Sequence, residues 1–187
     1  MRPRPRHIAA AIAVVALALP LGACGNKEKT TTFGATEGTY LDVGPIAYQV
    51  QISRILNPQD IEDRNYMQGV QGTLAPDEVW FAVFVRGQNT SSKTQQAAED
   101  FDITDTLDNR FRPVAIAKTN PFAYRSRPVG HGQLIPSGSS AAGAGVVQQG
   151  SMLLFKIKLS SLSDRPLEFH IKSPTVPQKV GTVELDV

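Results

Sequence analysis

The sequence is poor in the side chains that most often perform chemistry. Its 187 residues include one cysteine, Cys24, and three histidines. A single cysteine cannot close a disulfide within the chain, so the fold must be stabilised by apolar burial and backbone hydrogen bonds. It cannot supply a multi-cysteine metal site either.

Sequence motifs of catalysis are also missing. The chain contains no G-x-S-x-G, no S-x-x-K and no H-E-x-x-H pattern, which argues against the hydrolases and zinc enzymes that these motifs mark. Ser139-Ser140 near His131 fit a loop better than a catalytic pair, and neither His131 nor His170 has ligand partners at a metal-binding spacing. We therefore expect no enzyme activity, no cofactor and no transition-metal site.

Charge does not indicate a nucleic-acid partner. The chain carries 19 Lys+Arg and 17 Asp+Glu, and residues 1–23 hold three of the arginines and no acid. The rest of the chain has 16 basic and 17 acidic side chains, which gives a net charge of −1. No basic stripe with interleaved aromatic residues is present, and a nucleic-acid footprint needs one.

What is present at the N-terminus is an export signal. Three arginines lie within the first six residues, an apolar run follows from Ile8 to Pro20, and Leu21-Gly22-Ala23-Cys24 comes next. A basic start, a short apolar middle and a small-residue cleavage site are typical of a signal peptide. The order aliphatic, small, small, cysteine resembles the lipobox of bacterial lipoproteins, which implies cleavage after Ala23 and lipidation of Cys24. The alternatives are an unanchored secreted protein and a retained membrane helix, for which the run is short.

The chain divides into three parts. We predict a lipoprotein signal peptide over residues 1–23, then the lipidated cysteine and a flexible polar tether over 24–39, then one domain over 40–187. Cleavage leaves 164 residues, a length that suits a single domain with one core. The expected location is the extracytoplasmic face of a bacterial membrane, with the lipid on Cys24 as the contact to that membrane.

Strand signals dominate the domain. The apolar residues alternate or form short β-branched and aromatic runs. These segments are Tyr48–Ile52, Val79–Val85, Phe101–Ile103, Phe111–Ile116, Met152–Leu159, Leu167–Ile171 and Val183–Val187. Val79–Val85 has no polar residue, which predicts a strand buried on both faces. A short helix is indicated only over Pro58–Tyr66. We predict an all-β fold, an immunoglobulin-like antiparallel β-sandwich of about seven or eight strands.

The longest irregular stretch, Lys118 to Gly145, offers a contact for a partner. It carries Phe122, Tyr124, Arg125 and Arg127, and aromatic and arginine side chains are enriched at binding hot spots. The alternative is that the two rings fold back onto the rim of the sandwich.

A second candidate is an acidic cluster. Glu99, Asp100, Asp102, Asp105 and Asp108 fall within ten residues, and carboxylates near loops can hold calcium. The alternative is a solvated strand face whose charges keep an edge from pairing with another molecule.

The order of several segments resembles a known family. EVWFAVFVRGQN at Glu78–Asn89 is followed by Phe101–Asp105, by Leu134–Gly138 and by Leu153–Ile157. This order is similar to that of the extracellular immunoglobulin-like domains known as domain of unknown function 4352, over about Tyr40 to Val187. The resemblance implies a β-sandwich, export and frequent lipid anchoring, and it implies no enzyme activity and no ligand.

These observations together favour a membrane-anchored, non-catalytic binding or scaffolding module with a protein partner in the cell envelope. The alternative is an accessory lipoprotein that binds a small molecule or calcium.

The lipid anchor generates the first prediction. Changing Cys24→Ser removes the sulfur that would be alkylated, so we expect a precursor that is unlipidated and either uncleaved or mislocalised. Two acyl chains hold a protein at a membrane far more firmly than one, and the variant would lose both. Lipid labelling and membrane fractionation check this, and a variant that is lipid-labelled and processed like the parent would contradict it.

Overall fold

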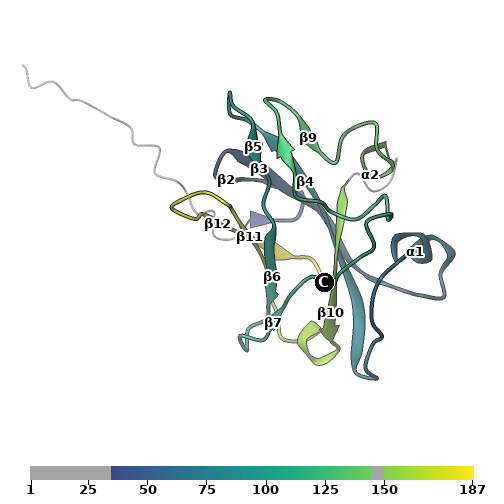
Figure 1. The fold of residues 1–187 in the computed structure, drawn as a ribbon. Helices are drawn as coiled ribbons and strands as arrows, with labels where there is room; N and C mark the ends of the chain where they lie inside the picture. The colour runs from purple at the N-terminus through teal and green to yellow at the C-terminus, as the bar shows by residue number, and fades with distance from the viewer. Residues whose placement is uncertain (1–34, 145–149) are drawn as a thin grey trace, which may run out of the picture.

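The computed structural model describes residues 35–144 and 150–187 (Figure 1). The signal peptide, Cys24 and most of the predicted tether lie outside the described residues. The strands are β1 (Ala35–Thr36), β2 (Tyr40–Val43), β3 (Ile46–Leu56), β4 (Glu78–Asn89), β5 (Gln95–Gln96), β6 (Asp100–Thr104), β7 (Arg110–Phe111), β8 (Pro128–Val129), β9 (Leu134–Ile135), β10 (Ser151–Lys158), β11 (Leu167–Lys172) and β12 (Val180–Leu185). The helices are α1 (Ile61–Tyr66), α2 (Ala141–Ala144) and the 3-10 turn η1 (Ser160–Leu162).

The strands form two larger sheets. The first sheet has the order β1-β12-β11-β6-β7, and the second has the order β10-β4-β3-β2, with β9 also beside β4. Neighbours are antiparallel except for β1, which runs parallel to β12. The strands β5 and β8 form a separate two-stranded ribbon.

The connectivity is that of an immunoglobulin fold. The neighbours β3, β4 and β10 follow the order of strands A, B and E, and β6, β11 and β12 follow that of strands C, F and G. Seven strands of the described chain have four or more residues. The predicted all-β sandwich of seven or eight strands is therefore confirmed, with several two-residue strands added to it.

Strand β4 is buried on both faces, as its apolar run predicts. Phe81, Val83 and Val85 point between the two sheets and join the main core, which also holds Phe101, Phe155 and Phe169. Trp80, Ala82 and Phe84 point the other way and form a second cluster. Successive side chains of a strand alternate between faces, so an all-apolar strand needs a cover on each side.

The outer face of β4, which carries Trp80 and Phe84, is covered by a third layer. This layer consists mainly of segments that are not strands. Leu56, Met152 and Leu154 complete the outer cluster from neighbouring strands, and half-buried side chains close it from above. These half-buried side chains come from the region of α1 and from residues 114–116. Helix α1 begins at Ile61, inside the predicted segment Pro58–Tyr66, because the Asp60 side chain accepts hydrogen bonds from the backbone N–H groups of Glu62 and Asp63.

The start of the domain differs from the prediction. The tether was expected to extend to residue 39, but Ala35–Thr36 pair with β12 and Ala35 is part of the main core. The Glu37 carboxylate accepts hydrogen bonds from the backbone N–H groups of Ser53 and Asp186. The folded domain therefore begins at Ala35 at the latest, because these residues close the edge of the first sheet.

The two-sided burial of β4 generates the second prediction. Phe81→Ala opens a hole in the main core and Phe84→Ala opens one under the third layer, so each is expected to lower the free energy of unfolding by about 3–5 kcal/mol. Chemical denaturation measures both. Leu107→Ala is the control, because Leu107 is 67% exposed and its change is expected to stay within about 0.5 kcal/mol. A Phe84 variant as stable as this control would show that the third layer is not packed.

Candidate functional site

The predicted contact loop, residues 120–127, is tied down at its first residue. Asn120 is buried, and its side-chain amide makes four hydrogen bonds. The Nδ2 group donates to the carbonyl oxygens of Tyr66 and Gln68 at 2.7 and 2.8 Å. The Oδ1 atom accepts from the backbone N–H groups of Phe122 and Ala123. Because every polar atom of the amide is used, Asn120 joins this loop to the α1 region.

The same loop runs along the free edge of β10. The backbone N–H of Met152 donates to Phe122 O at 2.7 Å, and the N–H of Tyr124 donates to Met152 O at 2.8 Å. Upstream, the N–H of Val114 donates to Leu154 O at 2.7 Å. These bonds satisfy an edge that would otherwise be open.

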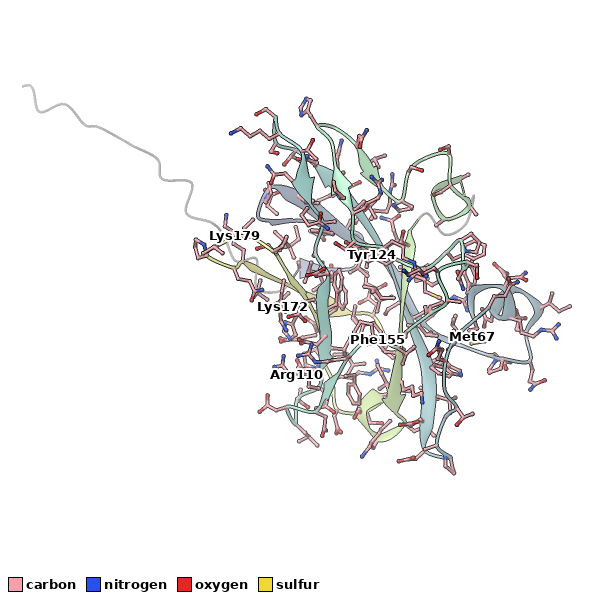
Figure 2. All side chains as sticks on the ribbon, in the orientation of Figure 1. Met67, Arg110, Tyr124, Phe155, Lys172 and Lys179 are labelled. Atoms are coloured by element: carbon pink, nitrogen blue, oxygen red, sulfur yellow. The ribbon has the colours of Figure 1, made fainter. Side chains whose placement is uncertain are left out.

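Tyr124 lies in the main core and not on the surface. Its ring is 7% exposed and packs edge-on against Phe101 with a centroid distance of 5.0 Å. Its hydroxyl donates to Ala98 O at 2.8 Å, while the Ala98 N–H donates to the Tyr48 hydroxyl at 2.7 Å. Burial raises the pKa of Tyr124 well above its ordinary value and raises that of Tyr48 as well. Figure 2 shows Tyr124 inside the molecule, as it does Phe155.

The prediction that Tyr124 contacts a partner is therefore wrong, because a core ring cannot reach one. Phe122 is half-buried and stacks edge-on against Tyr66, with ring centroids 4.8 Å apart. Both rings follow the alternative in which they fold back onto the sandwich. Of the four predicted contact residues, Arg125 and Arg127 keep their charged groups accessible.

Each of the two arginines is held by backbone carbonyl groups. The Nη2 of Arg125 donates to Ala117 O at 2.6 Å and to Ile116 O at 3.1 Å. The Nη2 of Arg127 donates to Leu134 O at 2.7 Å. Neither arginine forms a salt bridge with an acid of the described chain, so both charges remain without a partner of opposite sign.

A groove of about 690 Å³ opens beside these arginines. Its first wall is formed by Pro121, Ala123, Arg125 and Arg127, and its second by Gly132–Gly138, Ser140 and Ser151. Among the described residues, no acidic side chain lines it. The groove therefore combines two cations and several hydroxyl groups with apolar lining residues, which include the buried Ile135.

Sequence reasoning found one wall of this groove and missed the other. The second wall uses small and polar residues from Gly132 to Ser140, and such residues look like ordinary loop formers. The available signal was their position, since they follow directly on the arginine-bearing loop and share the same irregular stretch.

The acidic cluster does not converge on one point. The Asp102 carboxylate is buried on the outer face of the first sheet, and its Oδ2 accepts hydrogen bonds from Arg110 at 2.8 Å and from Lys172. Asp100 pairs with Arg112 at 3.2 Å. Lys172 and Arg110 lie on the side of β6 away from Phe155 (Figure 2). These acids therefore belong to a network of ion pairs across β6, β7 and β11.

Asp105 has a local role at the end of β6. Burial opposes its ionisation, but hydrogen bonds from Asn109 and from the Leu107 backbone N–H outweigh this and lower its pKa. Throughout residues 35–144 and 150–187, no three His, Cys, Asp or Glu side chains gather where they could hold a metal ion. This part of the chain therefore offers no cluster of carboxylates that supports the calcium hypothesis.

Both histidines of the described residues, His131 and His170, are hydrogen-bonded within the fold. His170 lies on the outer face of β11, between the hydroxyl groups of Thr104 at 2.9 Å and Thr182 at 3.1 Å. Desolvation lowers the pKa of His170, although Asp102 and Glu168 oppose the shift. His131 contacts Ser91 O through Nδ1 at 2.7 Å.

Among the helices of the described residues, none is long and apolar enough to cross a membrane.

No protein-family model and no curated protein matches the sequence. Solved structures with a similar chain path include the yjhA protein from Bacillus subtilis, with 12% identity, a TM-score of 0.49 and coverage of 81% of this chain and 99% of that chain. An uncharacterized β-sandwich protein from Clostridium difficile 630 has 8% identity, a TM-score of 0.46 and coverage of 82% and 93%.

A third structure is that of ycdA from Bacillus subtilis subsp. subtilis str. 168, described as a candidate lipoprotein. It has 10% identity and a TM-score of 0.46, and the match covers 80% of this chain and 39% of that chain. The present chain thus spans about two fifths of the length of ycdA. Likenesses at this level concern the chain path alone and say nothing of what this chain binds.

The buried hydroxyl pair generates the third prediction. Tyr124→Phe removes the donor to Ala98 O and leaves a buried carbonyl without that hydrogen bond, so we expect the free energy of unfolding to fall by about 1–3 kcal/mol. Tyr40→Phe is the matched control, because Tyr40 is 54% exposed. Thermal melts compare the two, and equal melting temperatures would show that the hydroxyl network contributes nothing.

Proposed function

We propose that this protein is a lipid-anchored, extracytoplasmic binding module without catalytic activity, and that its groove takes an acidic segment of a protein partner in the cell envelope. The observation that carries the proposal is the pair Arg125 and Arg127 beside a groove whose lining, in the part of the chain that the structure describes, contains no acid. Two cations that lack partners of opposite sign are the natural complement of carboxylates on a ligand.

The way the arginines are held supports this reading. A guanidinium group has five N–H donors, and hydrogen bonds to carbonyl groups occupy some of them on each arginine. The remaining donors keep a fixed direction because the head group is already fixed. Binding then costs little side-chain entropy, which is the usual advantage of a preorganised site.

The non-catalytic part of the proposal rests on the chemistry of the lining. The described lining of the groove contains serines and Gln133 but no histidine, acid or lysine, so residues 35–144 and 150–187 supply no general base there for a hydroxyl nucleophile. The anchoring part rests on the lipobox-like segment ending at Cys24. These features favour recognition at a membrane surface over a reaction.

The fourth prediction tests the groove with a defined probe. Hexaglutamate is titrated calorimetrically against the full-length protein, with hexaglutamine as the neutral probe. We expect hexaglutamate to bind and the double variant Arg125→Gln/Arg127→Gln to lose at least about tenfold in affinity, which corresponds to about 1.4 kcal/mol. Adding salt is expected to weaken the binding, because exposed charges are screened.

The matched control removes the same charge elsewhere. Arg64→Gln/Arg165→Gln changes two exposed arginines outside the groove lining and is expected to keep the affinity of the parent. Arg125→Lys/Arg127→Lys retains the charge and is expected to lose less than the glutamine pair. Equal losses in the two glutamine pairs, or equal binding of hexaglutamine, would contradict the proposal, and thermal melts confirm that every variant is folded.

A further inference from the structure

The hairpin between β11 and β12 presents an apolar side chain to solvent at one end of the sandwich. Val176 is 98% exposed, more than any other large hydrophobic residue of the described chain. The loop beneath it is well ordered by hydrogen bonds: the Lys179 N–H donates to Ser173 Oγ at 2.8 Å, and the Ser173 N–H donates to Lys179 O at 2.8 Å. The side chain is therefore held out by a defined turn.

Three more loops join this hairpin at the same end. A Cβ atom at Gly44 would meet the side chains of Ser173 and Thr175, and residues 44–45 share a groove of about 440 Å³ with the hairpin tip. The Thr90 N–H donates to Pro45 O at 3.2 Å, and His131 contacts the Ser91 carbonyl. The end is thus formed by residues 44–45, 90–94, 130–133 and 173–179.

The two ends of the sandwich differ in their number of acids. The four loops just named contain Lys93 and Lys179 and no aspartate or glutamate, and the link that enters β6 beside Lys172 adds one acid, Glu99. The links at the opposite end span residues 57–60, 74–77, 105–109, 159–166 and 186–187, with Arg165 as their single Lys or Arg. They carry six acids, namely Asp60, Asp77, Asp105, Asp108, Asp164 and Asp186.

The chain direction at the start of the fold points to the same end. Strand β1 runs parallel to β12, with Ala35 beside Val183, and β12 runs away from the hairpin tip. The N-terminal side of β1 therefore faces the hairpin. Ala35 is eleven positions after Cys24, and a chain segment of that length spans at most about 40 Å. A lipid on Cys24 would keep the domain within that distance of the bilayer.

We infer that the end carrying Val176 faces the membrane, and that the hairpin tip touches an anionic lipid surface. The inference rests on the proposed lipid anchor at Cys24. Moving an apolar side chain from water into the headgroup region lowers its free energy, and lysines are attracted to anionic headgroups. The aspartates of the opposite end are turned away from the same surface, so the charge distribution and the apolar tip favour one orientation.

The fifth prediction tests this orientation on the full, lipidated protein in vesicles of phosphatidylethanolamine and phosphatidylglycerol. Val176→Cys and, as the matched control at the opposite end, Leu107→Cys each receive an environment-sensitive fluorophore. A lipidated Cys24 has no thiol to label, so each variant carries one label. We expect brominated acyl chains to quench the label at position 176 at least twice as strongly as the label at position 107, and replacing phosphatidylglycerol by phosphatidylcholine to reduce that difference.

Three results would overturn the inference. Equal quenching at both positions means that the tip does not touch lipid. Protection of position 176 from aqueous iodide without quenching by brominated chains means that a protein covers it. Mass spectrometry of the same sample separates the anchor from the orientation: absence of a lipid on Cys24 removes both, while a lipidated protein with equal quenching leaves the anchor and removes the orientation.

Discussion

The structure depends on one constraint, which is that β4 is apolar on both of its faces. A sandwich of two sheets covers only one of them, where Phe81 and Val83 meet the opposite sheet. The other face, with Trp80 and Phe84, forces the connections on that side to fold back as a third layer. The position of residues 120–127 follows from this requirement, because they lie on the edge of the same sheet. The positions of the two arginines of the groove thus follow from the way the core is packed.

Strand patterns made most of the fold predictable. The run from Val79 to Val85 indicated a strand buried on both faces, and most of the alternating segments indicated the other main strands, as the structure confirms. The segment Phe111–Ile116 was wrongly expected to be a strand, because the structure has a strand only over Arg110–Phe111 and places Ile116 in the third layer. The direction of the Tyr124 ring could not be derived, because alternation carries information only inside a strand.

Two buried asparagines connect separate segments of the chain by hydrogen bonds, and sequence patterns do not reveal this role. Asn89 ends β4 with its Nδ2 donating to Lys93 O and Val129 O and its Oδ1 accepting from Ser91. Asn120 does the same for the third layer. In a sequence each reads as one more loop residue, although a buried amide with all of its hydrogen bonds satisfied fixes the chain at that point. For this reason the sequence predicted the charged residues of the groove, but it did not predict the buried asparagines that hold the neighbouring segments in place.

The covered edge of β10 has a consequence for many copies held on one surface. Proteins confined to two dimensions meet often and in similar orientations, and an open strand edge would let them polymerise by sheet extension. Here one end of the second sheet is closed by backbone hydrogen bonds from Val114 and Tyr124, and the other end is the four-residue strand β2. The first sheet ends in two-residue strands on both sides. Neighbouring domains on such a surface would therefore find no long open strand edge on which to extend either sheet.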